Sequence, residues 1–232
     1  LSVYGATLRK ATGEAADTGD DAVFADLPMP TLPDTSAPFN VLVTGIGGTG
    51  VVTVGALLSM AAHLEGKGVS CLDVTGLAQK NGPVTSHVRF ADAPDKLHAT
   101  RIASGGADLV LGCDIVVASN PDSLSKMARD RTAVVANDHV APTADFATNP
   151  NLDLSSKGME DAISQVASAK DAHFVSATAL ATALLGDAIA TNLFLVGYAF
   201  QLGRIPVSLG ALERAIELNG QAVAMNKRAL AW

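Results

Sequence analysis

Cysteine is scarce in this chain of 232 residues, which contains only Cys71 and Cys113. Two thiols are too few for a disulfide framework, a four-cysteine zinc site or an iron–sulfur cluster held by this chain alone. Both lie in apolar stretches, so we expect them to be buried as small hydrophobic side chains. Aromatic residues make up only 4% of the sequence, and the core must therefore be built from Ala, Val, Leu and Ile.

Positive charge is also in short supply. The 16 Lys and Arg residues against 23 Asp and Glu residues give a net charge of −7, the opposite sign from a general nucleic-acid binder. The segment from Ala11 to Asn40 has no Lys or Arg and holds six of the carboxylates, Glu14, Asp17, Asp20, Asp21, Asp26 and Asp34. No basic-then-apolar signal peptide opens the chain, so the cytoplasm is the expected compartment. Because the sequence begins without Met and ends just after a helical pattern, we expect a segment of a longer polypeptide.

Residues 1–38 are predicted to be a partly disordered linker or the tail of a preceding domain. Small and acidic residues at 11–21 bury too little apolar surface to offset the entropy of ordering. Prolines at 28, 30, 33 and 38 then favour an extended path. The second unit, residues 39–232, is predicted to be a folded domain.

Short apolar runs alternate with helical patterns from Phe39 onward. We expect strands over 40–44, 69–74, 83–90, 115–119, 133–137 and 173–175, and a helix end or short strand at 107–112. The strand over 83–90 alternates apolar with more polar residues, as a half-buried strand does. Helices are expected over 49–65, 159–167 and 209–218, with a last one ending near Leu230. The fold class is therefore α/β, with three α/β/α layers, a Rossmann-like, mostly parallel and possibly mixed sheet, and a helical C-terminal part.

The apolar stretch over 177–202 carries one formal charge, Asp187. Because Gly186-Asp187 interrupts it, we expect two helices packed in a protein interior, with no membrane span. This stretch is also predicted to help form a subunit interface.

A glycine loop follows the first predicted strand. Gly45, Gly47 and Gly50 have the G-x-G-x-x-G spacing, with Gly48 and Thr49 between them. Such a loop lets a phosphate approach the backbone at a helix N-terminus. Asp73 ends the second predicted strand, near where a ribose-binding carboxylate would lie. Two hypotheses remain open: a dinucleotide site, or glycines that only allow strand and helix to pack.

The segment after Asp73 departs from a Rossmann unit, because it makes a turn at Lys80-Asn81-Gly82 and continues as a strand. Lys80 at the tip of this turn and Arg89 on the more polar strand face could approach a bound phosphate, or could be solvated surface charges. The five histidines are scattered, and there is no nucleophile elbow or HExxH motif. No residue is identified as a general acid, a base or a nucleophile.

Together these segments resemble the gamma domain of 2-oxoacid:ferredoxin oxidoreductases, most closely the fused indolepyruvate ferredoxin oxidoreductases. The resemblance covers residues 39–232 and is carried by VTGIGGTGVV at 43–52, TGLAQKNGPVTSHVR at 75–89, GADLVLGCDIVVAS at 106–119, ANDHVAPT at 136–143 and AIELNGQAVAMNKRALAW at 215–232. Many relatives have Arg-Gly-Gly where this chain has Lys80-Asn81-Gly82, which changes the contacts expected at that turn.

The resemblance implies a component of an enzyme that decarboxylates a 2-oxoacid oxidatively, with coenzyme A accepting the acyl group and ferredoxin the electrons. Thiamine diphosphate, Mg and 4Fe-4S clusters would belong to partner domains or subunits, and the isolated chain is expected to be inactive. The implied coenzyme A contacts are Gly45, Gly47, Gly48, Thr49, Gly50, Lys80, Asn81, Gly82 and Arg89. The alternatives are a stand-alone NAD(P)-binding oxidoreductase domain and a non-catalytic interaction domain.

Overall fold

Short runs of Val, Leu and Ile form one sheet in the computed structural model, which describes residues 27–76, 82–140 and 156–232. The strands of this described part are β1 (Phe39–Ile46), β2 (Gly68–Thr75), β3 (Pro83–Ala91), β4 (Leu109–Gly112), β5 (Ala133–Asn137) and β6 (Ala172–Val175). Branched side chains fit the pleated surface of a strand. Wherever helices cover both faces, such runs carry little polar alternation.

The strands lie in the order β2-β3-β1-β4-β5-β6. β1, β4, β5 and β6 are parallel to one another, whereas β3 pairs antiparallel with both β1 and β2. The expected α/β fold with a mostly parallel, mixed sheet is therefore confirmed. β3 is inserted between β1 and β2, so the strand that follows the first helix is not the neighbour of β1.

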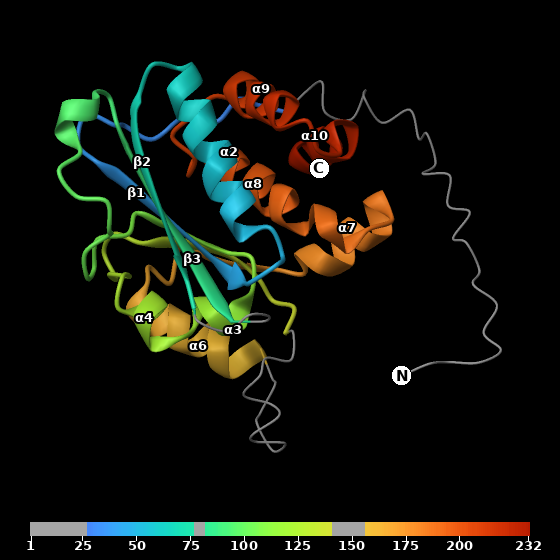
Figure 1. Cartoon of the computed structure of the whole chain (residues 1–232). Coiled ribbons are helices and arrows are strands. Elements are labelled where there is room, and N and C mark those ends of the chain that lie inside the picture. Colours follow the sequence, from blue (N-terminus) through green and yellow to red (C-terminus); the bar gives the residue numbers. More distant parts are fainter. Residues whose placement is uncertain (1–26, 77–81, 141–155) are drawn as a thin grey trace.

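Helices cover the two faces of the sheet and make three layers (Figure 1). One face carries α2 (Val51–Leu64), α7 (Ala177–Leu185), α8 (Thr191–Gln201), α9 (Leu209–Asn219) and α10 (Val223–Ala231). The other carries α3 (Ile115–Ala118), α4 (Pro121–Leu124) and α6 (Ser156–Val166). Two short 3-10 turns, η1 (Pro94–Lys96) and η2 (Ala188–Ala190), complete the described elements. No helix of the described part is long and apolar enough to cross a membrane.

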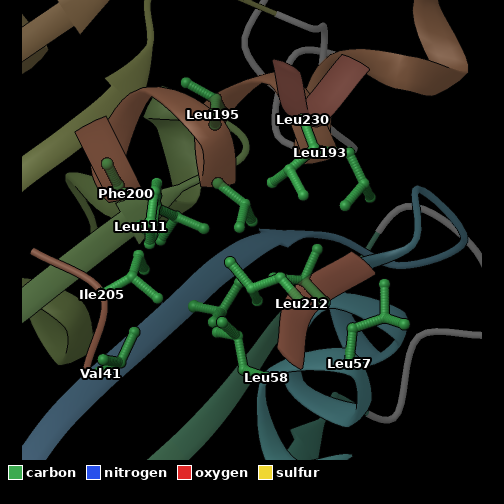
Figure 2. Close-up of a cluster of buried hydrophobic side chains, with 14 of the residues drawn as sticks. Val41, Leu57, Leu58, Leu111, Leu193, Leu195, Phe200, Ile205, Leu212 and Leu230 are labelled. Atoms are coloured by element: carbon green, nitrogen blue, oxygen red, sulfur yellow. The ribbon is translucent and has the colours of Figure 1, made fainter. Parts of the chain in front are cut away.

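The larger core lies between the sheet and the C-terminal helices. Figure 2 shows Leu57 and Leu58 of α2 meeting Leu193 of α8 and Leu212 of α9. Each such side chain contributes roughly 1.5–3 kcal/mol through its burial. A second cluster on the other face gathers around Ile102, Ile115 and Ile163. The core is aliphatic, as the shortage of aromatic residues requires.

Several helix boundaries match the sequence signals. Ser208 caps α9 by accepting a hydrogen bond from the Ala211 N–H at 3.3 Å. Gly186, with φ 77°, ends α7, and the Asp187 carboxylate then accepts from the Ile189 N–H at 2.9 Å. The expected break at Gly186-Asp187 is therefore confirmed.

Three local predictions were wrong. Residues 115–119 were expected to form a strand, but they begin a helix, because the Asp114 carboxylate accepts from the Val117 N–H at 3.0 Å and caps it. β3 was expected to be half-buried, yet Thr85 and His87 on its polar face are buried, and the Ile102 N–H donates to His87 Nδ1 at 3.2 Å. Cys71 was expected to be buried but is exposed, because β2 is an edge strand.

Residues 27–38 lie along the domain before β1 begins at Phe39. The Pro28 carbonyl accepts from Gln201 Nε2 at 2.8 Å, and the Thr35 carbonyl accepts from the Asp92 N–H at 2.9 Å. These contacts tie the segment to the ends of α8 and β3. The prediction for residues 1–26 lies outside the described residues.

Candidate functional site

The end of β1 and the loop between β1 and α2 contain two kinds of glycine. A Cβ at Gly45 would lie 2.6 Å from Val51 Cγ2 and 3.2 Å from Cys113 Cβ, so this glycine allows the helix to pack on the sheet. Gly48 has φ 90°, and a Cβ there would meet nothing within 4 Å. Gly50 has φ 92°. Packing therefore explains Gly45, whereas Gly48 is selected by its backbone conformation and borders open space.

Hydrogen bonds from three directions hold the loop. Thr49 Oγ1 donates to the Ile46 carbonyl at 2.7 Å, and Asn192 Nδ2 of α8 donates to the Thr49 carbonyl at 2.7 Å. The Gly47 N–H donates to the Gly82 carbonyl at 2.8 Å. The loop is thus fixed before any ligand arrives, which reduces the ordering cost of binding.

The N-terminus of α2 opens at this loop. Its N-cap is Gly50, which supplies no side-chain hydrogen bond to the first turn. The first N–H groups of a helix have no partner within the helix, and together with the helix dipole they attract an anion. Because α2 has 14 residues, it has a complete helix dipole, and the positive end of that dipole lies at the loop.

A cavity of about 640 Å³ adjoins the loop and includes Gly48, Thr49 and Gly50 in its lining. It is bounded by the C-terminal ends of three parallel strands, through Ile46 at the end of β1, Cys113 and Asp114 after β4, Asn137 at the end of β5 and His139 beyond it. The opposite wall comes from α7, η2, the start of α8 and the turn between α9 and α10. This volume falls within the range of small-molecule and cofactor sites.

The cavity lies at the point where the chain leaves the sheet in two directions. From β1 it passes into α2 on one face, and from β4 into α3 on the other face (Figure 1). In open α/β sheets, ligands bind in the crevice that such a change of direction creates. The topology and the glycine loop therefore indicate the same place.

Amide and hydroxyl groups dominate the polar lining. Asn137 Nδ2 donates to Thr178 Oγ1 at 2.8 Å, and the Thr178 N–H donates to Asn137 Oδ1 at 3.2 Å, which joins β5 to α7. Among the described residues that line the cavity there is no Lys or Arg, and Asp114 is the one carboxylate. Burial and the nearby Asp114 raise the pKa of the Cys113 thiol to about 12, so this thiol is protonated and a poor nucleophile at neutral pH. The arrangement is suited to binding.

The structure brings together part of the predicted site. Gly45 lies near the end of β1, and Gly47, Gly48, Thr49 and Gly50 form the loop that follows it. Gly82 lies beside this loop, where its carbonyl accepts from the Gly47 N–H. Lys80 and Asn81 lie outside the described residues.

Arg89 is not near the loop. β3 runs antiparallel to β1, with Val84 opposite Gly45 and Arg89 opposite Asn40. At about 3.4 Å per residue, the five intervening steps place Arg89 roughly 17 Å along the strand from the loop. The expected approach of Arg89 to a phosphate at this loop is therefore corrected: the antiparallel direction of β3 carries the residue to the opposite end of the sheet.

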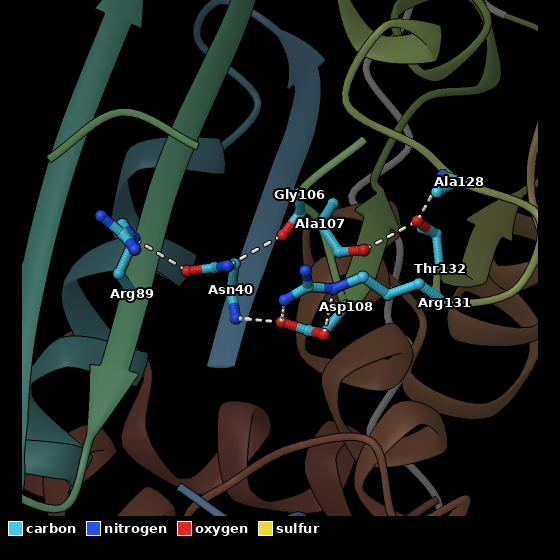
Figure 3. Close-up of polar contacts among 8 residues, drawn as sticks. All are labelled: Asn40, Arg89, Gly106, Ala107, Asp108, Ala128, Arg131 and Thr132. Carbon is cyan, nitrogen blue, oxygen red and sulfur yellow. Dashed lines mark hydrogen bonds and ion pairs between the residues drawn. The ribbon is translucent and has the colours of Figure 1, made fainter. Parts of the chain in front are cut away.

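At that end Arg89 has a structural environment (Figure 3). Its Nε donates to Asn40 Oδ1 at 2.8 Å, and its Nη1 donates to the Ala99 carbonyl. The Asn40 N–H in turn donates to Asp108 Oδ2 at 2.7 Å, and Asp108 forms an ion pair with Arg131 at 2.7 Å. The network links β3, β1 and the start of β4.

Asp73 does not have the position of a ribose-binding carboxylate either. It lies on the edge strand β2, where it is exposed and accepts a hydrogen bond from Ser86 Oγ of β3. β3 separates it from β1. The inserted strand therefore removes one feature on which the dinucleotide interpretation depended.

Sequence reasoning missed several residues of the cavity, namely Asp114, Asn137, Thr178 and Asn192. A usable signal existed for the first two, because each comes at the end of a buried apolar strand, where ligands of α/β folds bind. Thr178 and Asn192 lie on helices brought to the cavity by the tertiary fold. Within the described residues, no group of three or more His, Cys, Asp and Glu side chains could hold a metal ion.

The family model described as pyruvate ferredoxin/flavodoxin oxidoreductase matches residues 40–231. The chain belongs to this family. It is 29% identical over 197 residues to the indolepyruvate oxidoreductase subunit IorB of Archaeoglobus fulgidus. This match covers 82% of this chain and 91% of the relative. It is 26% identical over 188 residues to the gamma subunit common to the pyruvate and ketoisovalerate oxidoreductases of Pyrococcus furiosus, covering 80% and 89%.

Solved structures share the fold of this family member. The pyruvate oxidoreductase subunit PORC of Thermotoga maritima superposes with a TM-score of 0.57 at 20% identity, covering 84% of this chain and 93% of that chain. A 2-oxoglutarate:ferredoxin oxidoreductase from Magnetococcus marinus, solved with 2-oxoglutarate, coenzyme A and succinyl-CoA bound, gives 0.57 at 15% identity. There the match covers 84% of this chain but 30% of that longer chain. The relatives are thus gamma-type subunits and one section of a larger oxidoreductase polypeptide.

Proposed function

We propose that this chain is the gamma portion of a 2-oxoacid:ferredoxin oxidoreductase of the indolepyruvate type, and that its cavity binds coenzyme A. In the overall reaction the bond between the carboxyl and the oxo carbon of the 2-oxoacid breaks, carbon dioxide leaves, and a thioester bond forms to the coenzyme A sulfur. The electron pair released passes to ferredoxin. Thiamine diphosphate, Mg and iron–sulfur clusters are assigned to partner domains or subunits.

One observation carries the proposal. The open side of Gly48 and the uncapped N-terminus of α2 share a single cavity of about 640 Å³. A pyrophosphate needs close approach to backbone and a cluster of unpaired N–H groups, and this corner supplies both. Asn192 and Thr49 would hold the loop in its binding conformation.

The remaining cavity suits the neutral parts of the same ligand. Thr53, Asn137, Thr191 and Asn226 offer amide and hydroxyl groups to a ribose or a base. With the Cys113 thiol protonated, the described residues of the cavity would bind and orient the ligand, and the thiol of coenzyme A would react outside this chain.

A nicotinamide dinucleotide fits less well. In a dinucleotide-binding fold, a carboxylate at the end of the second strand, which lies next to β1 in the sheet, usually holds the ribose of the nicotinamide dinucleotide. β3 occupies that place here, and Asp73 lies one strand further out. The hypothesis of an interaction domain without a ligand fits less well too, because it gives no role to the cavity of about 640 Å³ into which the uncapped N-terminus of α2 opens.

The test uses the native protein that carries this chain. Its iron and thiamine diphosphate content is measured, followed by ferredoxin reduction with indolepyruvate or pyruvate, with and without coenzyme A, and by calorimetric titration with coenzyme A and with NADH. Both cofactors, coenzyme A-dependent reduction and a coenzyme A isotherm are expected. NADH binding without any response to coenzyme A would support the dinucleotide hypothesis instead.

A further inference from the structure

Lys126, which follows α4, is a buried residue with a charged side chain. It is 8% exposed, and among the described residues Asp122 is the carboxylate near its ammonium group, with Lys126 Nζ and Asp122 Oδ1 3.7 Å apart. The same oxygen lies 3.7 Å from Arg101 Nη2. A charge-assisted hydrogen bond to a carboxylate is normally about 2.7–2.9 Å long. Asp122 is therefore near both cations without forming a hydrogen bond to either.

Lys67 shows how a partly buried ammonium group is satisfied elsewhere in this protein. It lies 2.8 Å from Glu65 and donates a hydrogen bond to the Pro206 carbonyl at 2.6 Å. The side chain of Lys126 is more buried than that of Lys67, with 11% against 23% exposed, yet its ammonium group makes no hydrogen bond within the described part of the chain. Because a buried charge is costly unless it is paired and hydrogen-bonded, Lys126 is a cation whose binding capacity is unused.

A buried imidazole adds a neutral donor beside the two cations. The Ile102 N–H donates to His87 Nδ1 at 3.2 Å, so the proton of the neutral ring is on Nε2. His87 is 0% exposed, and its Nε2 has no hydrogen-bond partner among the residues described. Arg101 immediately precedes Ile102. After burial, the charges of Arg101 and Lys126 are the next causes that lower the pKa of His87 to about 4, so both cations act on this ring.

We propose that Arg101, Lys126 and His87 form a binding site for a small oxyanion of the phosphate or sulfate class. The guanidinium and ammonium groups would supply charge-assisted hydrogen bonds, and the Nε2–H of His87 would supply a third donor. Two positive charges face the single carboxylate of Asp122, so one bound anion balances the remaining charge. The Asp122 side chain is 56% exposed, and its carboxylate can turn into solvent when the anion binds.

This site is separate from the cavity. The Ala107 N–H, just before β4, donates to the Lys126 carbonyl at 2.9 Å, whereas β4 reaches the cavity at its other end, through Cys113. In Figure 1, α4 lies on the opposite face of the sheet from α2. An anion bound here is thus distinct from a phosphate at the glycine loop, and the proposal does not depend on the proposed function.

Equilibrium dialysis of the complete enzyme against radiolabelled inorganic phosphate at neutral pH tests the site. Arg101→Gln should raise the Kd for phosphate roughly tenfold or more, through loss of a charged donor. Arg131→Gln is the matched control, because its side chain is 44% exposed against 55% for Arg101, and its guanidinium group already pairs with Asp108 at 2.7 Å. Equal binding by the two variants, or no binding by the wild type at millimolar phosphate, would overturn the proposal.

Asp122→Asn should have the opposite effect and tighten phosphate binding several-fold, because it removes a negative charge 3.7 Å from both cations. A closed network of ion pairs without a ligand predicts no such gain, so unchanged binding by Asp122→Asn would contradict the proposal. Gly48→Ala identifies phosphate held at the glycine loop. If the only phosphate site found is weakened by Gly48→Ala and unaffected by Arg101→Gln, the proposed oxyanion site does not exist.

Discussion

Gly48→Ala and Gly66→Ala form a matched pair that separates ligand binding from backbone strain. Both glycines have positive φ, 90° and 72°, and a Cβ at either would meet nothing within 4 Å. An alanine in the left-handed region costs about 1–2 kcal/mol. Each variant should therefore lower the melting temperature by roughly 2–8 °C in a domain of this size.

The two positions differ in what they face. Gly48 borders the cavity at the start of α2, whereas Gly66 follows the other end of that helix. A methyl group at Gly48 would keep a phosphate away from the backbone N–H groups. Hydrogen bonds to a charged group contribute about 1.5–3 kcal/mol each, so the loss of one should raise the Kd for coenzyme A roughly tenfold to a hundredfold.

The assay is calorimetric titration of the complete enzyme with coenzyme A, with thermal unfolding of each variant alongside. Gly66→Ala should bind coenzyme A as the wild type does. The reasoning is refuted if Gly48→Ala binds as tightly as Gly66→Ala, or if both variants weaken binding equally.

Three more predictions follow from single contacts. Asn192→Ala removes the amide that holds the Thr49 carbonyl at 2.7 Å and should weaken coenzyme A binding by about fivefold to tenfold; an unchanged titration would contradict this role. Arg89→Ala should lower the free energy of unfolding by about 1–2 kcal/mol through loss of its hydrogen bonds to Asn40 and to the Ala99 carbonyl. It should leave the Kd for coenzyme A unchanged, and a urea titration and calorimetry would report the two quantities. Burial first, and then nearby cations, lower the pKa of His87 from 6.5 to about 4. Between these two pH values the unfolded state binds a proton that the folded state does not bind. About 3 kcal/mol of the free energy of unfolding should therefore be lost as the pH falls from 6.5 towards 4. His87→Gln should flatten the profile of unfolding free energy against pH between 4 and 6.5. An unaltered slope would contradict this role of His87.

Much of the fold follows from local signals along the chain. The strand before the glycine loop, the helix after it and the cap at Ser208 all depend on residues close together in sequence. The break at Gly186-Asp187 is of the same kind, since one residue must adopt positive φ and the next must cap a turn. Local chemistry of this kind acts in the same way whatever the rest of the fold does.

The position of β3 could not be obtained in that way. The alternation along this strand correctly separates Arg89 from its apolar neighbours, but it does not reveal the direction in which the strand runs. Insertion of β3 beside β1 decides that Arg89 is far from the loop and Asp73 is at the sheet edge. Long-range pairing of this kind depends on the whole chain and leaves little trace in any one segment.

Only part of the cavity could be predicted from the sequence, for the same reason. Its glycine loop is contiguous in sequence, whereas Asn137, Thr178 and Asn192 come from three separate elements. The helix at 115–118 was missed because its Ile-Val-Val run favours a strand, and the cap from Asp114 prevails over that preference.

A structure of the complete enzyme with coenzyme A bound would test the central claim most directly. The account predicts density for the pyrophosphate at the N–H groups of Gly48, Gly50 and the first turn of α2, with the thiol end directed out of the cavity past α7. Coenzyme A bound elsewhere in the enzyme, with this cavity empty or filled by side chains of a partner, would contradict it.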